Sequence, residues 1–342
     1  MDSKGALHLA VAIAIYNLVS AITDIFSFTF LCRKSMKRLL GNLFIALFVV
    51  LSPSCYIDEE HNSTIPTTKA EWSKVYEYTP APGQFINDTT NSGSGFDGTQ
   101  TTPEKAIQYA ESRLEKGSFV SLGGFGGYII VGFDHNVLNA PRYDFEIMGN
   151  PNPSSSEPGV VWVMKDENGN GLPDDTWYEL SGSETGKAET VQDYAITYYR
   201  PTAPKMAVRW TDNLGGSGEI NHITNEHSQD YYYPLWITED SYTLRGTRLE
   251  ARNYDKAGDG KNWVLPPYDW GYSDNYSATD YISSERSNRF DISNAIEADG
   301  KSVELDYINF VKVQCAVNAQ SGHLGEVSTE VCGFKDLNID QI

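Results

Sequence analysis

The chain has 342 residues and a formal net charge of −20, with 46 acidic against 26 basic side chains. This acid excess repels phosphate backbones and anionic lipid headgroups, so it excludes a nucleic-acid-binding protein and suits the binding of cations. The composition includes 21 Tyr, 7 Trp and 29 Gly, and long amphipathic helical patterns are rare. Together these features are typical of an all-β protein.

Two interpretations fit the first 35 residues. The apolar stretch 7–32 exceeds the roughly 20 residues that span a bilayer, although Asp24 inside it is costly there. With the next apolar run it would form a helical hairpin in the inner membrane. The alternative, which we favour, is that translation starts at Met36 and that residues 1–35 do not belong to the working protein.

Residues 36–54 have the order of a secretory signal peptide. Lys37 and Arg38 precede an apolar run at 39–51, and small residues lead to Cys55. A cysteine directly after such a run resembles the lipobox of bacterial lipoproteins. We therefore predict that Cys55 is lipidated and anchors the chain to the outer membrane. The three acids in residues 57–60 resemble the surface-export signal of lipoproteins from Bacteroides-like bacteria, which implies a cell-surface location.

A flexible tether is expected at residues 55–75, which are polar and rich in Thr and Ser. A single ligand-binding domain is expected to follow over residues 76–342. Its one helix is predicted at 102–117, because Thr102 can cap it, Pro103 suits its first position and Gly117 can end it.

The glycine-rich stretch 118–135 has two apolar runs around four glycines. It lacks the last glycine of a dinucleotide-binding loop and leads into a strand pattern, so it predicts a hairpin or a bulged strand. Further strands are expected at 143–149, 159–166, 176–182, 193–200, 233–237, 242–252, 290–296, 302–317 and 328–337. Many strands without intervening helices predict an all-β fold of the β-sandwich or jelly-roll type, with one short N-terminal helix.

A structural calcium loop is the sharpest local signal, in "DENGNGLPDDTWYE" at 166–179. Calcium takes oxygen ligands at alternating positions around a tight turn that contains glycine. The predicted ligands are the side chains of Asp166, Asn168, Asn170, Asp174 and Glu179 and the carbonyl of Leu172, with Asp175 as the alternative to Glu179 for the last carboxylate. A polar Asn-Gly turn without metal is the alternative.

The remaining polar signals are weaker. A disulfide between Cys315 and Cys332 is expected outside the cell, and two buried free thiols are the alternative. His222 and His227 have no zinc-like continuation. The sequence has no nucleophile elbow and no Cys/His pair at a recognisable spacing, and carboxylates are too numerous for a glycosidase pair to be selected. We therefore expect a protein that is not an enzyme.

Ligand binding is predicted in the aromatic loop 261–281. Rigid rings with interspersed amides and acids suit a large, partly apolar ligand such as a sugar or a corrin ring. Burial of about half of these rings in the core is the alternative. The predicted contacts are Trp263, Tyr268, Trp270, Tyr272, Asp274 and Asn275.

Several segments together resemble the cell surface lipoproteins of gut Bacteroides. They include "SLGGFGGYIIVGFDH", "YDFEIMGN", "SEPGVVWVMKDENGNGLPDDTWYELSGSE", "WGYSDN" and "INFVKVQCAVNAQSGHLGEVSTEV", and the resemblance covers residues 76–340. Some members of this family are similar to vitamin B12 (cobalamin) capture lipoproteins that assist TonB-dependent transporters. The resemblance implies a surface protein that binds a corrinoid and delivers it to such a transporter. A carbohydrate-binding lipoprotein of a glycan-uptake system is the alternative, and an enzyme acting on glycans is a third class.

Overall fold

A computed structural model describes residues 69–91 and 93–339. The chain divides into Met1–Ile65 and Pro66–Ile342, and all described residues belong to the second part. The predicted leader 1–54, Cys55 and the tether as far as residue 68 therefore lie outside the described residues. Among the described residues, no helix is long and apolar enough to cross a membrane.

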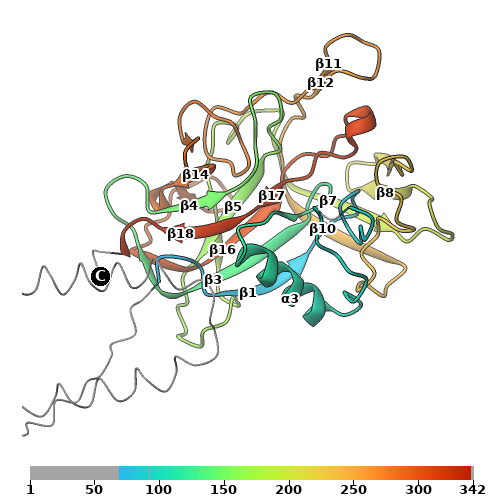
Figure 1. The fold of residues 1–342 in the computed structure, drawn as a ribbon. Coiled ribbons are helices and arrows are strands. Elements are labelled where there is room, and N and C mark those ends of the chain that lie inside the picture. The colour runs from blue at the N-terminus through green and yellow to red at the C-terminus, as the bar shows by residue number, and fades with distance from the viewer. Residues whose placement is uncertain (1–68, 92, 340–342) are drawn as a thin grey trace, which may run out of the picture. The chain divides into compact units, whose positions relative to one another are not determined.

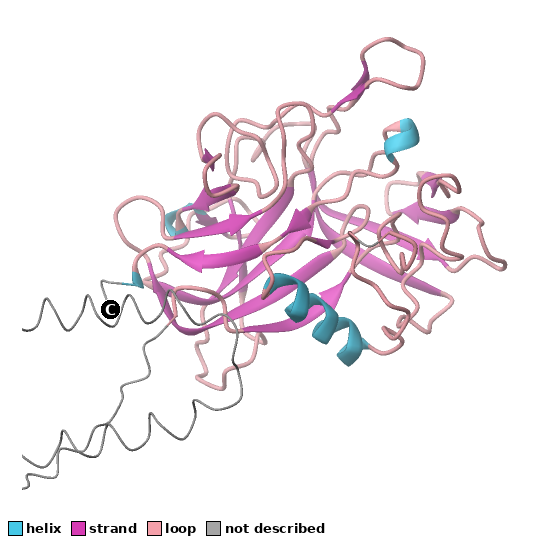
Figure 2. Cartoon of the chain, viewed as in Figure 1, coloured by secondary structure: helices cyan, strands magenta, loops and turns pink. Residues whose placement is uncertain are grey.

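Strands dominate the described chain, and the predicted all-β, sandwich-like fold is confirmed (Figures 1 and 2). The largest sheet has six antiparallel strands. In spatial order they are β1 (Lys74–Thr79), β3 (Tyr128–Leu138), β16 (Tyr307–Cys315), β5 (Gly159–Met164), β6 (Trp177–Leu180) and β15 (Ala295–Ile296).

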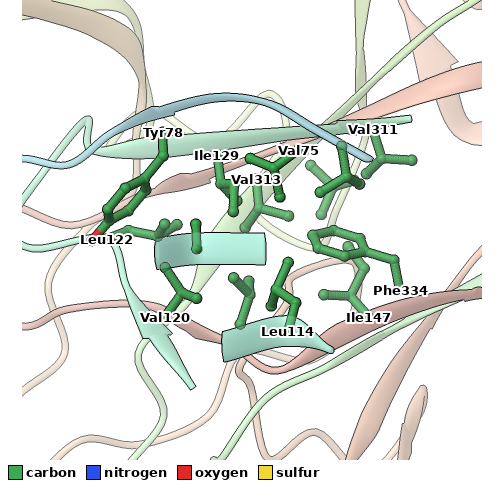
Figure 3. Close-up of a cluster of buried hydrophobic side chains, with 14 of the residues drawn as sticks. Val75, Tyr78, Leu114, Val120, Leu122, Ile129, Ile147, Val311, Val313 and Phe334 are labelled. Carbon is green, nitrogen blue, oxygen red and sulfur yellow. The ribbon is translucent and has the colours of Figure 1, made fainter. Parts of the chain in front are cut away.

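A four-stranded sheet shares the main hydrophobic core with this large sheet. Its order is β13 (Tyr281–Ile282), β14 (Ser287–Phe290), β4 (Phe145–Met148) and β18 (Gly333–Asp336). Val311 and Val313 from the large sheet pack in one cluster with Ile147 and Phe334 from the smaller one (Figure 3). Alternate residues of a strand point to opposite faces, so this core uses only one face of the six-stranded sheet. The side chains on the opposite face of this sheet are not part of the main core and can form a separate site.

A second four-stranded sheet has its own core. Its order is β10 (Ser241–Arg248), β7 (Val191–Tyr199), β8 (Val208–Asp212) and β9 (Ser217–Ile220). The described chain also contains two-residue strands, which pair β11 (Tyr254–Asp255) with β12 (Trp263–Val264) and β2 (Val120–Ser121) with β17 (Glu330–Val331), and short 3-10 helices at Ile292–Asn294 and Gly322–Leu324.

The predicted helix is confirmed as α3, Pro103–Leu114. The Thr102 hydroxyl accepts from the backbone N–H of Lys105 at 3.4 Å, and Pro103 occupies the first turn. Gly117 follows the helix with a φ of +60°, which favours glycine. The helix packs into the main core through Ala106, Tyr109, Ala110 and Leu114.

The glycine-rich stretch does not form a hairpin, because β2 pairs with β17 while β3 pairs with β1 and β16. The bulged-strand alternative is the better description, because the register of β3 against β16 shifts between Gly132 and Val137. In the pairing with β1 the extra residue is Tyr76, in β1. Glycine is required at position 127 because the backbone of Leu122 and of Ala81 lies too close for a side chain. A Cβ at Gly127 would lie 1.8 Å from the Leu122 carbonyl oxygen.

Two further expectations are wrong. Residues 233–237 form turns and not a strand, because Pro234 has no N–H for a strand ladder. The rings of Tyr233 and Trp236 are buried there as core. The expected tether also ends before residue 75. The N–H of Trp72 donates to the Phe334 carbonyl at 3.2 Å, and β1 begins at Lys74.

Candidate functional site

Several hollows in the described surface combine polar groups with aromatic rings, and two of them also hold buried glutamate side chains. The first, here called the acidic cleft, has a volume of about 440 Å³ and is lined by Glu157, Glu226, Glu326 and Glu330 among other residues. The second, the aromatic hollow, has a volume of about 380 Å³ and is lined by Trp162, Trp177, Glu179, Gln192, Arg245 and Lys312 among others. Both volumes fall within the range of small-molecule sites.

Segments far apart in the sequence bring carboxylates together beside the acidic cleft. Glu157 precedes β5, and its N–H donates to the Asp274 carbonyl at 3.0 Å. Glu330 lies in β17, and its N–H donates to Asp274 Oδ2 at 2.9 Å. The backbone N–H of Asn150 donates to Asp274 Oδ1 at 2.9 Å. Asp274 is thus held by two backbone donors between the other two acids.

Burial sets the protonation of this group. It raises the pKa of both Glu157 and Asp274 above the ordinary range of a carboxyl group, and the Asp274 charge raises the pKa of Glu157 further. Burial and the neighbouring acids raise the pKa of Glu330 well above its ordinary value. The cause is general, because a low-dielectric environment disfavours the charged form and like charges reinforce the effect.

Glu326 lines the same cleft and is 2% exposed. Its Oε1 accepts from the Gln84 N–H at 2.8 Å, whereas its Oε2 has no hydrogen-bond partner within the described residues. Burial raises its pKa to about 8. One wall of the cleft carries the edge-to-face rings of Phe85 and Phe119, whose centroids are 5.5 Å apart.

The aromatic hollow lies on the face of the six-stranded sheet that points away from the main core. Lys312 pairs across strands with Trp162, and Trp162 pairs with Glu179, so these side chains form one row. Trp177 is two residues from Glu179 on β6 and therefore points to the same face. The neighbouring Val161 and Val163 alternate into the main core.

Ionisable groups in this hollow have unusual surroundings. Burial raises the pKa of Glu179 to about 7, and its Oε2 accepts from the Thr247 hydroxyl. The Lys312 ammonium lies 4.5 Å from the ring centroid of Tyr128 and 5.7 Å from that of Trp162, and burial lowers its pKa. Among the described residues no carboxylate forms an ion pair with Lys312.

The predicted calcium loop joins β5 to β6. Asp166 accepts backbone N–H bonds from Gly169, Asn170 and Gly171 at 2.8 to 3.1 Å. The side-chain amides of Asn168 and Asn170 both donate to Asp174 Oδ1, at 3.1 and 3.2 Å. Four of the predicted ligands are thus gathered in one turn, which is also compatible with a polar turn without metal. Leu172, whose carbonyl is also a predicted ligand, lies between Asn170 and Asp174 and has an exposed side chain.

Glu179 does not join that turn, which corrects its assignment as a ligand. It lies within β6 opposite Trp162, and the β-strand register points its carboxylate into the aromatic hollow. Asp175 is the carboxylate that lies close to the loop, since its Oδ2 accepts from the Glu167 N–H at 2.9 Å. The calcium site itself stays a prediction.

Of the predicted ligand-binding residues in loop 261–281, some are buried in the protein and others are partly exposed. Tyr268 and Tyr272 are each 2% exposed, so their rings offer no surface to a ligand. They pack in a third core cluster, which also contains Val160, Leu249, Leu265, Ala316, Val317 and Val327. Asn275 is fully buried, and its side chain hydrogen-bonds the backbone of Tyr268 in both directions at 2.9 Å. Asp274 belongs to the carboxylate group described above.

Two tryptophans of that loop keep partial exposure. Trp263 packs against the third core cluster, and its Nε1 donates to the Gly260 carbonyl at 3.2 Å. Trp270 lines another hollow, of about 610 Å³, together with Tyr143, Asp280 and Arg289. Of the six predicted residues, Tyr268 borders only a space of about 10 Å³, whereas Trp270 lines a hollow large enough for a ligand.

The predicted disulfide is absent, and Cys315 and Cys332 are free. Cys315 lies at the end of β16 in the six-stranded sheet, and its thiol donates to the Val327 carbonyl at 3.4 Å. Cys332 lies between β17 and β18, where its N–H donates to the Met148 carbonyl. Cys315 lies in a sheet that includes neither β17 nor β18, and the free-thiol alternative describes both residues.

Apart from Glu179 and Asp274, the residues named above in or beside the two hollows were not among the site residues predicted from the sequence. Alternation in "GVVWVM" (159–164) places Trp162 on the face opposite Val161 and Val163, and this signal could have indicated an outward-facing ring. Glu157, Glu326 and Glu330 follow no local pattern. Glu326 and Glu330 share one segment, and only the pairing of distant segments brings Glu157 to them.

No family model matches this chain, and a search of curated proteins gave no match. The assignment of function therefore depends on the geometry of the two hollows and on the sequence features given above.

Proposed function

We propose that this chain is a non-catalytic binding protein that holds a carbohydrate in the aromatic hollow. The observation that carries the proposal is the row formed by Lys312, Trp162 and Glu179, with the second indole of Trp177 on the same sheet face. Sugar rings present apolar faces and hydroxyl edges. Aromatic faces stack on the former, and charged side chains bond the latter.

The polar groups of the hollow complement hydroxyl groups. The Lys312 ammonium has no carboxylate partner among the described residues, so its N–H groups can donate to a sugar oxygen. Glu179 accepts from Thr247 and has one more oxygen for a hydroxyl. The Nε1 of Trp162 has no partner within the described residues, and an oxygen acceptor would remove the cost of that unpaired donor.

The corrinoid expected from the family resemblance is less well supported. That expectation depended on an exposed aromatic loop, and the rings of Tyr268 and Tyr272 lie in the core. Trp263 and Trp270 keep part of their surface exposed. The geometry therefore favours the carbohydrate alternative over a corrinoid.

The proposed location is the outer surface of the cell, through a lipid on Cys55, with an outer-membrane TonB-dependent transporter as the partner that receives the ligand. This part of the proposal depends on the signal-peptide and lipobox pattern of residues 36–55 and on the resemblance to Bacteroides lipoproteins. The net charge of −20 agrees with a protein that does not bind nucleic acid.

A glycan array followed by calorimetry on the best ligand tests the proposal. We expect Trp162→Ala and Trp177→Ala each to weaken binding at least about tenfold, which corresponds to about 1.4 kcal/mol. Trp270→Ala is the matched control, because it removes an indole from a different hollow. Loss of binding in the control alone would place the site elsewhere.

Two more measurements separate the competing classes. Cobalamin is red, so protein that retains colour after soaking and desalting would support the corrinoid and contradict the carbohydrate. Product analysis of the bound glycan over hours should show no cleavage. Turnover that Glu179→Gln abolishes would make the protein an enzyme.

A further inference from the structure

Three carboxylates beside the acidic cleft lie as close together as the ligands of one metal ion. One oxygen each from Glu157, Asp274 and Glu330 lies within 4.8 Å of the other two. Asp274 and Glu330 are 1% and 4% exposed, so water does not separate them as it does surface acids. Gathering three acids in such a place costs free energy unless a positive charge or protons neutralise them.

The part of the chain that the structure describes places no basic side chain within ion-pairing distance of this group. Among the described residues, no Lys, Arg or His forms an ion pair with Glu157, Asp274, Glu326 or Glu330. Arg286 acts on Asp274 only through its longer-range field. The Asn150 side chain is a neutral partner of two of the acids. With its amide nitrogen turned to the acids, it donates to Asp274 Oδ1 at 3.2 Å and to Glu330 Oε2 at 3.0 Å.

A fourth acid provides a separate indication of a ligand. Glu326 lines the cleft with Glu157 and Glu330 and is 98% buried, and its Oε2 finds no partner among residues 69–91 and 93–339. Its charge acts on both of those neighbours. Buried polar atoms in native proteins nearly always have a partner, so an unpaired carboxylate oxygen at a polar cleft indicates a missing one.

We propose that Glu157, Asp274 and Glu330 bind one divalent cation of the size of calcium, with Glu326, which lines the same cleft, as a fourth acid near the ion. Calcium takes oxygen ligands at about 2.3–2.6 Å, so two ligands on opposite sides of the ion are up to about 5 Å apart. The observed limit of 4.8 Å fits that span. Magnesium, at about 2.0–2.1 Å, would need the carboxylates to move closer together.

The ligand set is made of oxygen atoms alone, which disfavours zinc and copper. The site is also distinct from the predicted calcium loop at 166–174, none of whose residues lines the acidic cleft. It shares no lining residue with the aromatic hollow either. Cation binding and carbohydrate binding can therefore be tested separately.

The experiment is a calcium titration of the chelator-treated chain by calorimetry, without any carbohydrate. An Asp166→Ala background removes the loop as a second source of binding. We expect one calcium ion to bind in this background, and Glu330→Gln or Glu157→Gln to weaken that binding at least tenfold. Asp274 is left unchanged, because it also holds two backbone N–H groups and its replacement could unfold the protein.

Circular dichroism shows whether each Gln variant is folded, and Glu326→Gln is used if either of them is not. A background protein that binds no calcium, or binding that the folded Gln variants leave unchanged, would overturn the proposal. Magnesium should bind at least tenfold more weakly than calcium, and tighter binding of magnesium would contradict the size argument.

Discussion

The backbone N–H of Glu157 donates to the carbonyl of Asp274 at 3.0 Å, which places two acids from distant parts of the sequence side by side. The next bonds in the same direction join Gly159 and Ser273, each donating to the other's carbonyl at 3.0 Å. Backbone hydrogen bonds therefore hold these two segments together and keep the two acids close to each other. Changing a side chain in the cleft removes a charge without removing the pairing of these segments.

Stability should fall as the pH rises from 5.5 to 8.5 when the protein is kept in chelator. Burial raises the folded-state pKa of the acids concerned above the unfolded value, so the folded state holds more protons. Their contribution is complete at pH 4 and is lost as pH rises through 6 to 8. The acids are Asp144, Glu157, Glu179, Asp274, Glu326 and Glu330.

Urea midpoints at the two pH values measure this effect. Glu179→Gln removes one such group outside the acidic cleft, so its midpoint should depend less on pH. The expected difference is a few kcal/mol at most, because one pKa unit corresponds to about 1.4 kcal/mol. A midpoint that rises or stays level toward pH 8.5 would contradict the assigned burial of these acids.

The loop between β5 and β6 should give a calcium-dependent melting temperature if the predicted calcium site exists. Asp166→Ala should abolish the part of the calcium-induced rise that depends on this loop. The same variant should also lower the melting temperature in chelator, because Asp166 accepts three backbone N–H groups there.

Asp255→Ala is a matched control for that experiment. Asp255 also accepts backbone N–H groups in an exposed turn, from Ala257 at 3.2 Å and from Gly260, but no Asn pair faces it. The control should lose stability in chelator and keep the full response to calcium. Equal responses in both variants would leave the loop as a polar turn.

Gly127→Ala should destabilise the fold strongly. The added Cβ would lie 1.8 Å from the Leu122 oxygen and 2.4 Å from the Ala81 nitrogen, both backbone atoms that cannot turn aside. We expect a loss of about 3 kcal/mol or more in the free energy of unfolding. Gly186→Ala is the control, because Gly186 has a φ of +78° and open space around it, so only about 1–2 kcal/mol of backbone strain applies.

Cys315 and Cys332 should both be alkylated in denaturant without a reductant, as peptide mass spectrometry would show. In the folded protein Cys315 should react slowly, because burial raises the pKa of its thiol to about 11 and little thiolate is present. Protection of both cysteines in denaturant, removed by reductant, would restore the disulfide.

Local signals identified the elements that depend on neighbouring residues. Thr102, Pro103 and Gly117 fixed the ends of α3 within a few positions, because caps act on the adjacent turn. The expected strand at 302–317 begins only at Tyr307, and β8 at Val208–Asp212 was not expected at all. Strand boundaries depend on pairing partners, which a single segment does not reveal.

The sequence by itself determined that this protein is all-β, where its helix lies and that it is strongly acidic, because these properties follow from composition and from contacts within a few residues. Only the tertiary structure decided that Glu157, Asp274 and Glu330 meet, that Trp162 faces Lys312 and Glu179, and that the two cysteines stay apart. Those contacts join residues distant in the chain. The order of strands in the sheets selects them, and no short pattern encodes that order.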